Sequence, residues 1–437
     1  MIWLQLLVVL VAIIIGARIG GVGLGVMGAI GLAVLTFVFG LQPASPPIDV
    51  MLIITAVITA AAAMHAAGGL DYLVSVATKI LVKHPSRITY LGPAVTYLAT
   101  FVAGTGHVSY SLLPVIAEVA RKTGIRPERP LSIAVIASQQ AITASPVSAA
   151  TAAMIALLSP MGVMTYHILG IAIPATIIGV LAGAFFASKM GKELKDDPEY
   201  QKRLAEGVFD NGKQTEIKDS TPEAKRSVLI FVLGVVAVVV LGSIPSLMPS
   251  WTVNGETVTL RMTELIEIGM LCTAALIVIL CKAKVDLIGK SSVFSAGMQA
   301  VIAIFGIAWM GDTFIAANLE FLKSGLVDIV QQYPYSFALI LFVMSILLYS
   351  QAATVKALLP LGISLGLPAA SLIAMYPAVN GYFFIPNYPT LVAAINFDST
   401  GTTRIGKYVL NHSFMIPGLV STAVAIAAGF LIASVVM

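Results

Sequence analysis

Long apolar segments recur along nearly the whole sequence, and they constrain the fold more than any other feature. Each runs for roughly 16–22 residues, the length an α-helix needs to cross about 30 Å of hydrocarbon, whereas barrel strands would alternate over about 10 residues. Of the 437 residues, 58% are hydrophobic and only 11% are charged, too few for the surface of a soluble globule. The sequence therefore predicts an all-α integral membrane protein.

Ten segments qualify as full membrane spans when apolar runs are bounded by charge, glycine or proline. They are residues 2–17, 22–40, 48–67, 131–158, 167–187, 227–243, 264–281, 296–312, 369–395 and 411–435. The first basic residue is Arg18, so the N-terminus lacks the positive region that opens a secretory signal peptide. We therefore expect residues 2–17 to be a retained first span.

Two further segments, residues 88–120 and 335–365, have the pattern of a helical hairpin: an apolar run, a short polar tip and a second apolar run. Glycine at such a tip allows the backbone to turn tightly. The tip residues and the small residues beside them are Gly104, Thr105, Gly106, His107 and Ser109 in the first hairpin, and Ser350, Gln351 and Thr354 in the second. Paired hairpins in two halves of a chain are a signature of transporters.

A polar stretch at residues 188–226 divides the chain into two halves. It holds nine basic and nine acidic residues, 18 of the 46 charged residues in the sequence, and this balance favours a solvated linker. The predicted first repeat covers residues 1–187 and the predicted second repeat covers residues 227–437. Each contains three spans, a hairpin, a broken helix (131–158 or 369–395) and a final span.

The basic residues predict how these segments are oriented, because lysine and arginine collect at the cytoplasmic ends of spans. If the chain starts outside, 22 of its 25 lysine and arginine residues lie in inner segments. Both flanks of the first hairpin are basic, so that hairpin must enter from the inside and return there. The second half then begins inside, which makes the repeats inverted, the linker cytoplasmic and both termini periplasmic.

One more segment in each half, residues 70–84 and 319–333, carries apolar residues at helical spacing and ends next to a proline. This pattern predicts amphipathic helices that lie along the membrane interface. An arm of this kind on each side would brace a moving bundle.

Proline interrupts two of the predicted spans, in ITASPVSAATAA (142–153) and in FIPNYPTLVAA (384–394). Non-helical backbone at this depth is tolerated where it faces protein or a water-filled cavity. Each break also starts a half-helix whose N-terminal N–H groups suit a carboxylate. We predict an anion site between tips and breaks, with candidates Ser145, Pro146, Ser148, Asn387, Tyr388 and Thr390. The alternative is a proline kink packed by neighbouring helices.

Lys356 is the only basic residue that this scheme places inside the apolar zone, where a charge normally has a functional or pairing role. It is a candidate for binding a substrate carboxylate. The alternatives are that it pairs with an acidic side chain or extends to the outer face. His107 likewise has two interpretations: it donates to an anion or takes up a proton, or it satisfies a local carbonyl.

The acidic residues argue against a cation or proton antiporter built on paired carboxylates. Asp312 and Asp398 fall at the ends of predicted spans, where solvation is expected. Glu118 lies near the basic end of its hairpin, and we expect it to pair with Arg121 or Lys122.

Motifs for enzymatic chemistry are missing from the sequence. Cys272 and Cys281 fall nine residues apart in one predicted helix, roughly 13 Å, which is too far for a disulfide between them. They suggest neither a redox centre nor a metal site. The net charge of +4 is no sign of nucleic-acid binding in so apolar a chain. We therefore expect no enzyme activity, no cofactor, no metal and no nucleic-acid partner.

Several long blocks of the sequence share a pattern with one transporter family. They are GTGHVSYSLLPVIAEVA (104–120), RPERPLS (126–132), ITASPVSAA (142–150), SQAATVKALLP (350–360) and PTLVAAINFDSTGTTRIGK (389–407). With these blocks the chain resembles, over essentially its whole length, the anaerobic C4-dicarboxylate (Dcu) transporters of Gram-negative bacteria, in the DcuA/DcuB branch.

The resemblance implies uptake and exchange of fumarate, malate, aspartate and succinate across the inner membrane, chiefly fumarate/succinate antiport in anaerobic respiration. It also implies an inverted-repeat transporter of the elevator type. The partners it implies are dicarboxylates, the lipid bilayer, a second copy of the chain and a regulatory membrane sensor kinase. The alternative function is a cation- or proton-coupled transporter of another organic anion such as citrate.

Overall fold

The computed structural model describes residues 1–19, 22–207, 221–253, 256–318, 321, 332–348, 350–386, 388–406 and 410–437. Within these residues six helices are long and apolar enough to cross a membrane, and a bent helix pair makes a seventh if it counts as one span. The six are Glu128–Met161, Thr165–Ser188, Pro222–Gly242, Met262–Cys281, Val293–Ala317 and Met415–Val436. The prediction of a helical, multi-pass membrane protein is confirmed.

The first half of the chain folds into helices that follow the predicted order. They are α1 (Ile2–Ile19), α2 (Gly23–Ala33) with a π-helical turn η1 (Val34–Val38), α3 (Ile48–Ala66), α4 (Gly69–Lys83), η2 (Pro85–Arg87), α5 (Ile88–Ala103), η3 (Gly106–Val108), α6 (Ser109–Lys122), α7 (Glu128–Ala144), α8 (Ala149–Leu158), η4 (Ser159–Met161) and α9 (Thr165–Ser188). The expected arm is α4, which turns away from α3 by 69°. The second expected arm, 319–333, lies almost wholly outside the described residues.

The linker and the second half follow. Their elements are η5 (Leu194–Asp196), α10 (Pro198–Ala205), α11 (Pro222–Ser243), η6 (Pro245–Leu247), β1 (Ser250–Val253), β2 (Glu256–Thr259), α12 (Met262–Cys281), α13 (Val285–Ile288), α14 (Ser292–Ala303) with a π-helical turn η7 (Ile304–Ala308), α15 (Trp309–Ala317), α17 (Ser336–Leu348), α18 (Gln351–Ser364), α19 (Ala369–Ala374), η8 (Tyr376–Phe383), α20 (Pro389–Phe397) and α21 (Met415–Val436).

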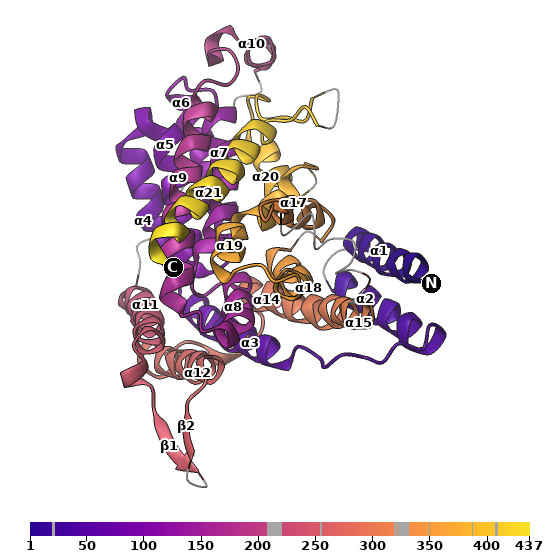
Figure 1. Ribbon diagram of the computed structural model, residues 1–437. Helices are drawn as coiled ribbons and strands as arrows, with labels where there is room; N and C mark the ends of the chain where they lie inside the picture. The colour runs from indigo at the N-terminus through magenta and orange to yellow at the C-terminus, as the bar shows by residue number, and fades with distance from the viewer. Residues whose placement is uncertain are drawn as a thin grey trace.

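A two-stranded antiparallel hairpin is the exception to the all-α prediction among the described residues. Strands β1 and β2 pair with Ser250 opposite Thr259, and the hairpin projects from the end of the molecule opposite to α10 (Figure 1). β-branched residues on both sides of an Asn-Gly pair favour such a hairpin, so a local signal for it was present in the sequence.

The two halves interlock rather than form separate bodies. The last helices of the halves, α9 and α21, pack along each other, and α3 packs against α12 (Figure 1). A Cβ atom on Gly179 of α9 would lie only 2.4 Å from the carbonyl oxygen of Ser421 in α21, so glycine is what permits this close approach. Residues distant in sequence are thereby brought together around α7 and α8.

Candidate functional site

The first break lies between α7 and α8, and two serine hydroxyls satisfy the backbone there. Ser148 caps α8, where its Oγ accepts a hydrogen bond from the Thr151 N–H at 3.1 Å and donates one to the Ile142 carbonyl at 2.6 Å. Ser145 donates to the carbonyl oxygen of Phe101 in α5 at 2.6 Å. Both serines are fully buried, and Pro146 between them is half-buried. The chain therefore leaves helical geometry between Ala144 and Ala149, and these hydroxyls satisfy the carbonyl groups beside the interruption.

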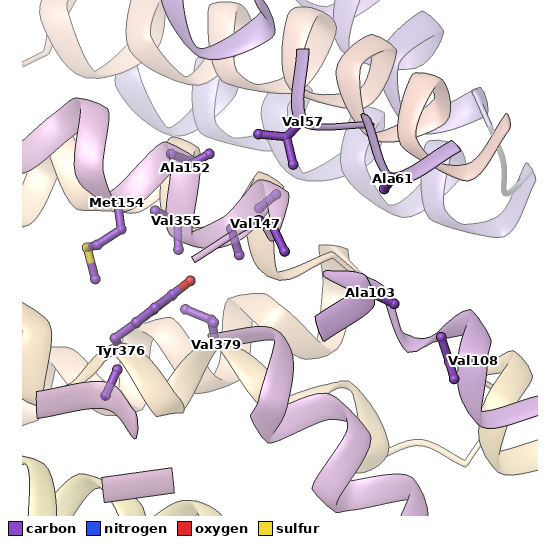
Figure 2. Packing of buried hydrophobic residues seen from close by; sticks show 14 of the residues in the cluster. Val57, Ala61, Ala103, Val108, Val147, Ala152, Met154, Val355, Tyr376 and Val379 are labelled. Atoms are coloured by element: carbon purple, nitrogen blue, oxygen red, sulfur yellow. The ribbon is translucent and has the colours of Figure 1, made fainter. Parts of the chain in front are cut away.

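The tip of the first hairpin, between α5 and α6, packs directly against this break. Gly104 has a φ of +68°, and a Cβ atom on it would lie 2.7 Å from the carbonyl oxygen of Val147. Figure 2 shows Ala103 and Val108 on either side of the tip. The structure thus brings the tip and the break of the first half together.

The structure places the other predicted residues of this tip in different surroundings. Ser109 is buried and donates to the carbonyl of Gly106 at 2.6 Å, a local role. Thr105 is half-buried. The side chain of His107 lies outside what the structure describes.

The second tip, at the start of α18, reaches the first half of the chain. Ser350 caps α18 by accepting from the Ala353 N–H at 3.2 Å, and the Thr354 hydroxyl donates to the Ser350 carbonyl at 2.7 Å. Helix α18 packs along α8, and Val355 of α18 and Ala152 of α8 are among the buried side chains in Figure 2.

Gln351, the first residue of α18, connects three segments of the chain. Its Nε2 donates to Tyr382 Oη at 2.6 Å, to Asn380 Oδ1 at 2.9 Å and to the Gln139 carbonyl at 3.3 Å. The side chain is buried. Gln351 therefore ties the second hairpin to both broken helices.

The second break is longer than predicted and begins earlier. Helix α19 ends at Ala374, and tight 3₁₀ turns carry the chain through η8, with Asn380 outside helical geometry at φ −94° and ψ 18°. The break at 384–394 is therefore corrected to a segment that begins at Tyr376, because YPAVNGYF forms 3₁₀ turns where we expected continuous helix.

The polar contacts of this segment lie mainly before the predicted residues. Asn380 Nδ2 donates to Gln140 Oε1 at 3.2 Å and to Thr143 Oγ1 at 3.4 Å, both in α7. The rings of Tyr382 and Tyr388 lie 4.4 Å apart.

Of the two predicted residues at the end of this break, only one lies within the described residues. Thr390 in α20 is buried, and its hydroxyl has no hydrogen-bond partner among the described residues. Asn387 lies outside the described residues.

Four residues of the site were missed in the sequence: Gln139, Gln140, Asn380 and Tyr382. The adjacent amides of Gln139 and Gln140 were the available signal, because polar side chains in the middle of an apolar span are costly and so mark function or packing. Asn380 and Tyr382 offered a weaker signal, in a segment whose proline and glycine disturb the helix.

Lys356 is buried but lies on another side of α18 from Gln351. Five helical positions separate them, which is roughly 140° around the helix axis. Lys356 interacts electrostatically with Asp312 and Asp49. Among the described residues no carboxylate oxygen lies within 4.0 Å of its amino group. The structure therefore does not join Lys356 to the polar contacts of Gln351.

The expectation that Asp312 lies solvated at a span end is wrong. Helix α15 continues the span to Ala317, and Asp312 Oδ1 is buried with no hydrogen-bond partner among the described residues. The neighbouring Gly311 lies against Ala357 of α18. An acidic group therefore lies inside this span because the π-helical turn η7 and α15 form one continuous helical segment.

Asp398 is also not solvated, because the loop after α20 folds around it. Its carboxylate accepts from the backbone N–H groups of Thr400 at 2.9 Å and Thr403 at 2.6 Å, and from the Thr402 hydroxyl at 2.8 Å. Only 3% of the residue is exposed. These local donors stabilise the buried carboxylate, and no described lysine or arginine forms a salt bridge with it.

The expectation for Glu118 is confirmed, since its carboxylate lies 2.7 Å from Arg121 and 3.2 Å from Lys122. In the described part of the chain no three histidine, cysteine or acidic residues are grouped so that they could hold a metal ion. The candidate site is therefore made of neutral amides and hydroxyls together with half-helix N-termini.

Apolar spans that break at buried polar contacts define a multi-pass membrane transporter. The chain belongs to the family of anaerobic C4-dicarboxylate membrane transporters, whose family model matches residues 1–437. It is a protein of the bacterial inner membrane, and it is a transporter rather than an enzyme.

Individual relatives agree with this assignment. The C4-dicarboxylate transporter DcuA of Escherichia coli K12 is 46% identical over 437 residues, covering 99% of each chain. The anaerobic C4-dicarboxylate transporter DcuB of Escherichia coli O6:H1 is 40% identical and covers 99% of this chain and 98% of its own. The crystal structure of the Alcanivorax borkumensis YdaH transporter is similar in fold, with a TM-score of 0.56 at 13% identity, over 95% of this chain and 98% of that one.

Proposed function

We propose that the protein exchanges C4-dicarboxylates, namely fumarate, malate, aspartate and succinate, across the inner membrane, with fumarate/succinate antiport as its main activity. The observation that carries this proposal is that both hairpin tips meet the broken helices: Gly104 lies against Val147, and Gln351 bonds to Gln139 and Asn380. The names of the relatives supply the substrate class.

The binding site in this proposal consists of the tips and the breaks. Helices α8, α18 and α20 all begin here, and their N-terminal N–H groups are suited to carboxylates. The proposed substrate-binding residues are those predicted from the sequence: Gly104, Thr105, Gly106, His107, Ser109, Ser145, Pro146, Ser148, Ser350, Gln351, Thr354, Lys356, Asn387, Tyr388 and Thr390. The unpartnered Thr390 hydroxyl supports the proposal, because a buried polar group without a partner costs about 1–3 kcal/mol that a ligand would recover.

Lys356 supplies the positive charge in this proposal. A dicarboxylate brings two negative charges, whereas each half-helix N-terminus offers only about half an opposing charge. An unpaired lysine near the bilayer centre costs about 2.5–3.5 kcal/mol on insertion scales. A bound dicarboxylate would relieve that cost and so favour obligatory exchange over uniport, provided that α18 turns Lys356 toward the site during transport.

The transport cycle in this proposal is of the elevator type, in which inverted repeats with re-entrant hairpins carry the site across the membrane. Ten spans, a cytoplasmic linker and periplasmic termini complete the scheme, which the basic residues and the opposite positions of α10 and the β-hairpin in Figure 1 support. A homodimer and a membrane sensor kinase are the further partners that the family resemblance implies.

Counterflow in proteoliposomes tests the function directly. Vesicles loaded with unlabelled succinate should take up labelled succinate, and external fumarate, malate or aspartate should compete with this uptake. Competition by citrate, or a requirement for a sodium or proton gradient with no exchange in its absence, would instead favour the alternative transporter of another organic anion.

A further inference from the structure

Gln139 is a buried amide whose polar side-chain atoms find no hydrogen-bond partner among the described residues. It lies in the middle of α7 and is 3% exposed, and neither its Oε1 nor its Nε2 is bonded within the described part of the chain. Buried side-chain amides are nearly always bonded, because each unpartnered atom costs about 1–3 kcal/mol. Because both Oε1 and Nε2 of Gln139 lack a partner in the parts of the chain that the structure describes, we expect a bound molecule to supply one.

The place of Gln139 on α7 indicates where that partner binds. Around the helix it lies about 100° after Ser138 and about 40° before Thr143. Ser138 faces the first hairpin tip, since a Cβ atom on Gly106 would lie 3.4 Å from its hydroxyl oxygen. Thr143 faces the second break, where its hydroxyl accepts from Asn380 at 3.4 Å. Gln139 therefore projects between the tip of one half and the break of the other.

The neighbouring amides of Gln140 and Gln351 differ from Gln139, because their side chains already form hydrogen bonds within the protein. Gln140 accepts from Asn380 at 3.2 Å and donates to the Thr422 hydroxyl at 3.3 Å. Gln351 donates to three oxygen atoms, one of which is the backbone carbonyl of Gln139 itself. These two amides hold the site together, whereas the side chain of Gln139 makes no such bond to any described residue.

We propose that Gln139 recognises the group on carbon 2 of the transported dicarboxylate. Its Nε2 donates to a carboxylate oxygen, which every C4-dicarboxylate offers. Its Oε1 needs a donor, which the hydroxyl of malate and the ammonium of aspartate supply and which succinate and fumarate lack. This inference rests on the proposed function, and it makes Gln139 a specificity-determining residue for substrates with a 2-hydroxy or 2-amino group.

Gln139 is enclosed on all sides in this structure. A substrate reaches it only when one of the two tips, at Gly104–Gly106 or at the start of α18, moves away from α7. A tip that closes over malate or aspartate gives Oε1 a hydrogen-bond donor. A tip that closes over succinate or fumarate leaves Oε1 as it is in this structure, so these substrates are still bound through their carboxylates but with one hydrogen bond fewer.

The experiment is competition against uptake of labelled fumarate in proteoliposomes. L-Malate is compared with (S)-2-methylsuccinate, which replaces the hydroxyl by a methyl group of similar size. The unaltered protein should bind malate at least about tenfold more tightly, as expected for one buried hydrogen bond. In Gln139→Met, which keeps the volume and removes both polar atoms, all affinities should fall and the malate preference should disappear.

A second variant and a control complete the test. Gln139→Glu retains an acceptor and should keep its preference for aspartate over succinate, although its negative charge weakens both. Ser132→Ala, in the same helix, removes only a hydroxyl bonded to the Arg129 carbonyl and should leave all ratios unchanged.

Failure of the inference and failure of the proposed function give different results. No preference for malate in the unaltered protein, or an equal loss for both inhibitors in Gln139→Met, would overturn the role of Gln139 while dicarboxylate exchange stands. Lack of fumarate uptake by the unaltered protein would overturn the proposed function. If Gln139→Met does not fold, the unaltered protein and Gln139→Glu still decide the question.

Discussion

Gly104 lies so close to Val147 that a Cβ atom would approach the Val147 carbonyl oxygen to 2.7 Å. The φ of +68° at Gly104 already excludes most other residues, and the contact excludes even the smallest side chain. This contact between Gly104 and Val147 joins the first hairpin tip to the first break. Transport in the proposed mechanism depends on the contact.

Gly104→Ala should reduce succinate counterflow at least about tenfold, because the left-handed backbone costs about 1–2 kcal/mol and the tip must also move off the break. Gly124→Ala is the matched control, since Gly124 has a φ of +73° but nothing within 4 Å of a Cβ atom. It should lose stability and keep transport. Equal transport in the two variants would show that the contact with Val147 is unimportant.

Gln351→Met should also lower exchange at least about tenfold, since it leaves Asn380 Oδ1 and Tyr382 Oη without their donor in a buried place. The measurement is the initial rate of fumarate/succinate exchange at matched protein levels. Ser364→Ala, which removes a hydroxyl bonded to the Leu361 carbonyl on the same helix, is the control and should exchange normally. Normal exchange by Gln351→Met would show that the second tip is not part of the binding site.

Lys356→Ala should weaken binding of succinate and fumarate together and turn strict exchange into leak, whereas Lys356→Arg should keep the charge but fit poorly. The double variant Lys356→Ala with Asp312→Asn separates two roles. If the lysine serves only to neutralise Asp312, it becomes dispensable in the double variant, and normal binding and strict exchange should return. If the lysine binds substrate, the double variant should show the same weakened binding and the same leak as Lys356→Ala.

The linker should make stability depend on acid pH through Asp197. Burial opposes ionisation of this carboxyl, but the hydrogen bond from Arg126 at 2.5 Å and the N–H groups at the start of α10 outweigh it, so the pKa of Asp197 lies below its ordinary value of 3.8. Its stabilising contribution is complete above that value and is lost as the pH falls through the lower pKa of the folded state.

Asp197→Asn should therefore lower the free energy of unfolding by about 3 kcal/mol at pH 7, because Glu128 is then the only described carboxylate paired with the buried Arg126, and by less near pH 3. The unfolding temperature of the purified protein in detergent, measured from pH 7 downward, checks this. If the unaltered protein and Asp197→Asn lose the same stability in acid, the loss is due to groups other than Asp197.

The proposed topology predicts opposite labelling of two sites in a background without Cys272 and Cys281. A cysteine in place of Thr257 in the β-hairpin should react with an impermeant thiol reagent in intact cells. A cysteine in place of Lys202, whose side chain is 68% exposed in the linker, should react only after permeabilisation. Labelling of the linker position in intact cells would reverse the orientation.

The sequence by itself determined the local features of the protein. Apolar runs located the six long apolar helices of the described residues, glycine and proline marked the turn at Gly104 and the interruption at Pro146, and a basic segment beside Glu118 predicted its ion pairs. These signals are local because helix length, turn geometry and pairing between residues three and four positions apart depend on neighbours in the chain.

Only the tertiary structure decided which buried polar groups have partners. Asn380 bonds to Gln140 across 240 positions of sequence, and Gln351 bonds to the Gln139 carbonyl across 212. An apolar pattern places such residues inside a span but does not say which helix faces them. Whether a buried amide is bonded, like Gln140, or lacks a partner among the described residues, like Gln139, therefore depends on how the two halves pack together.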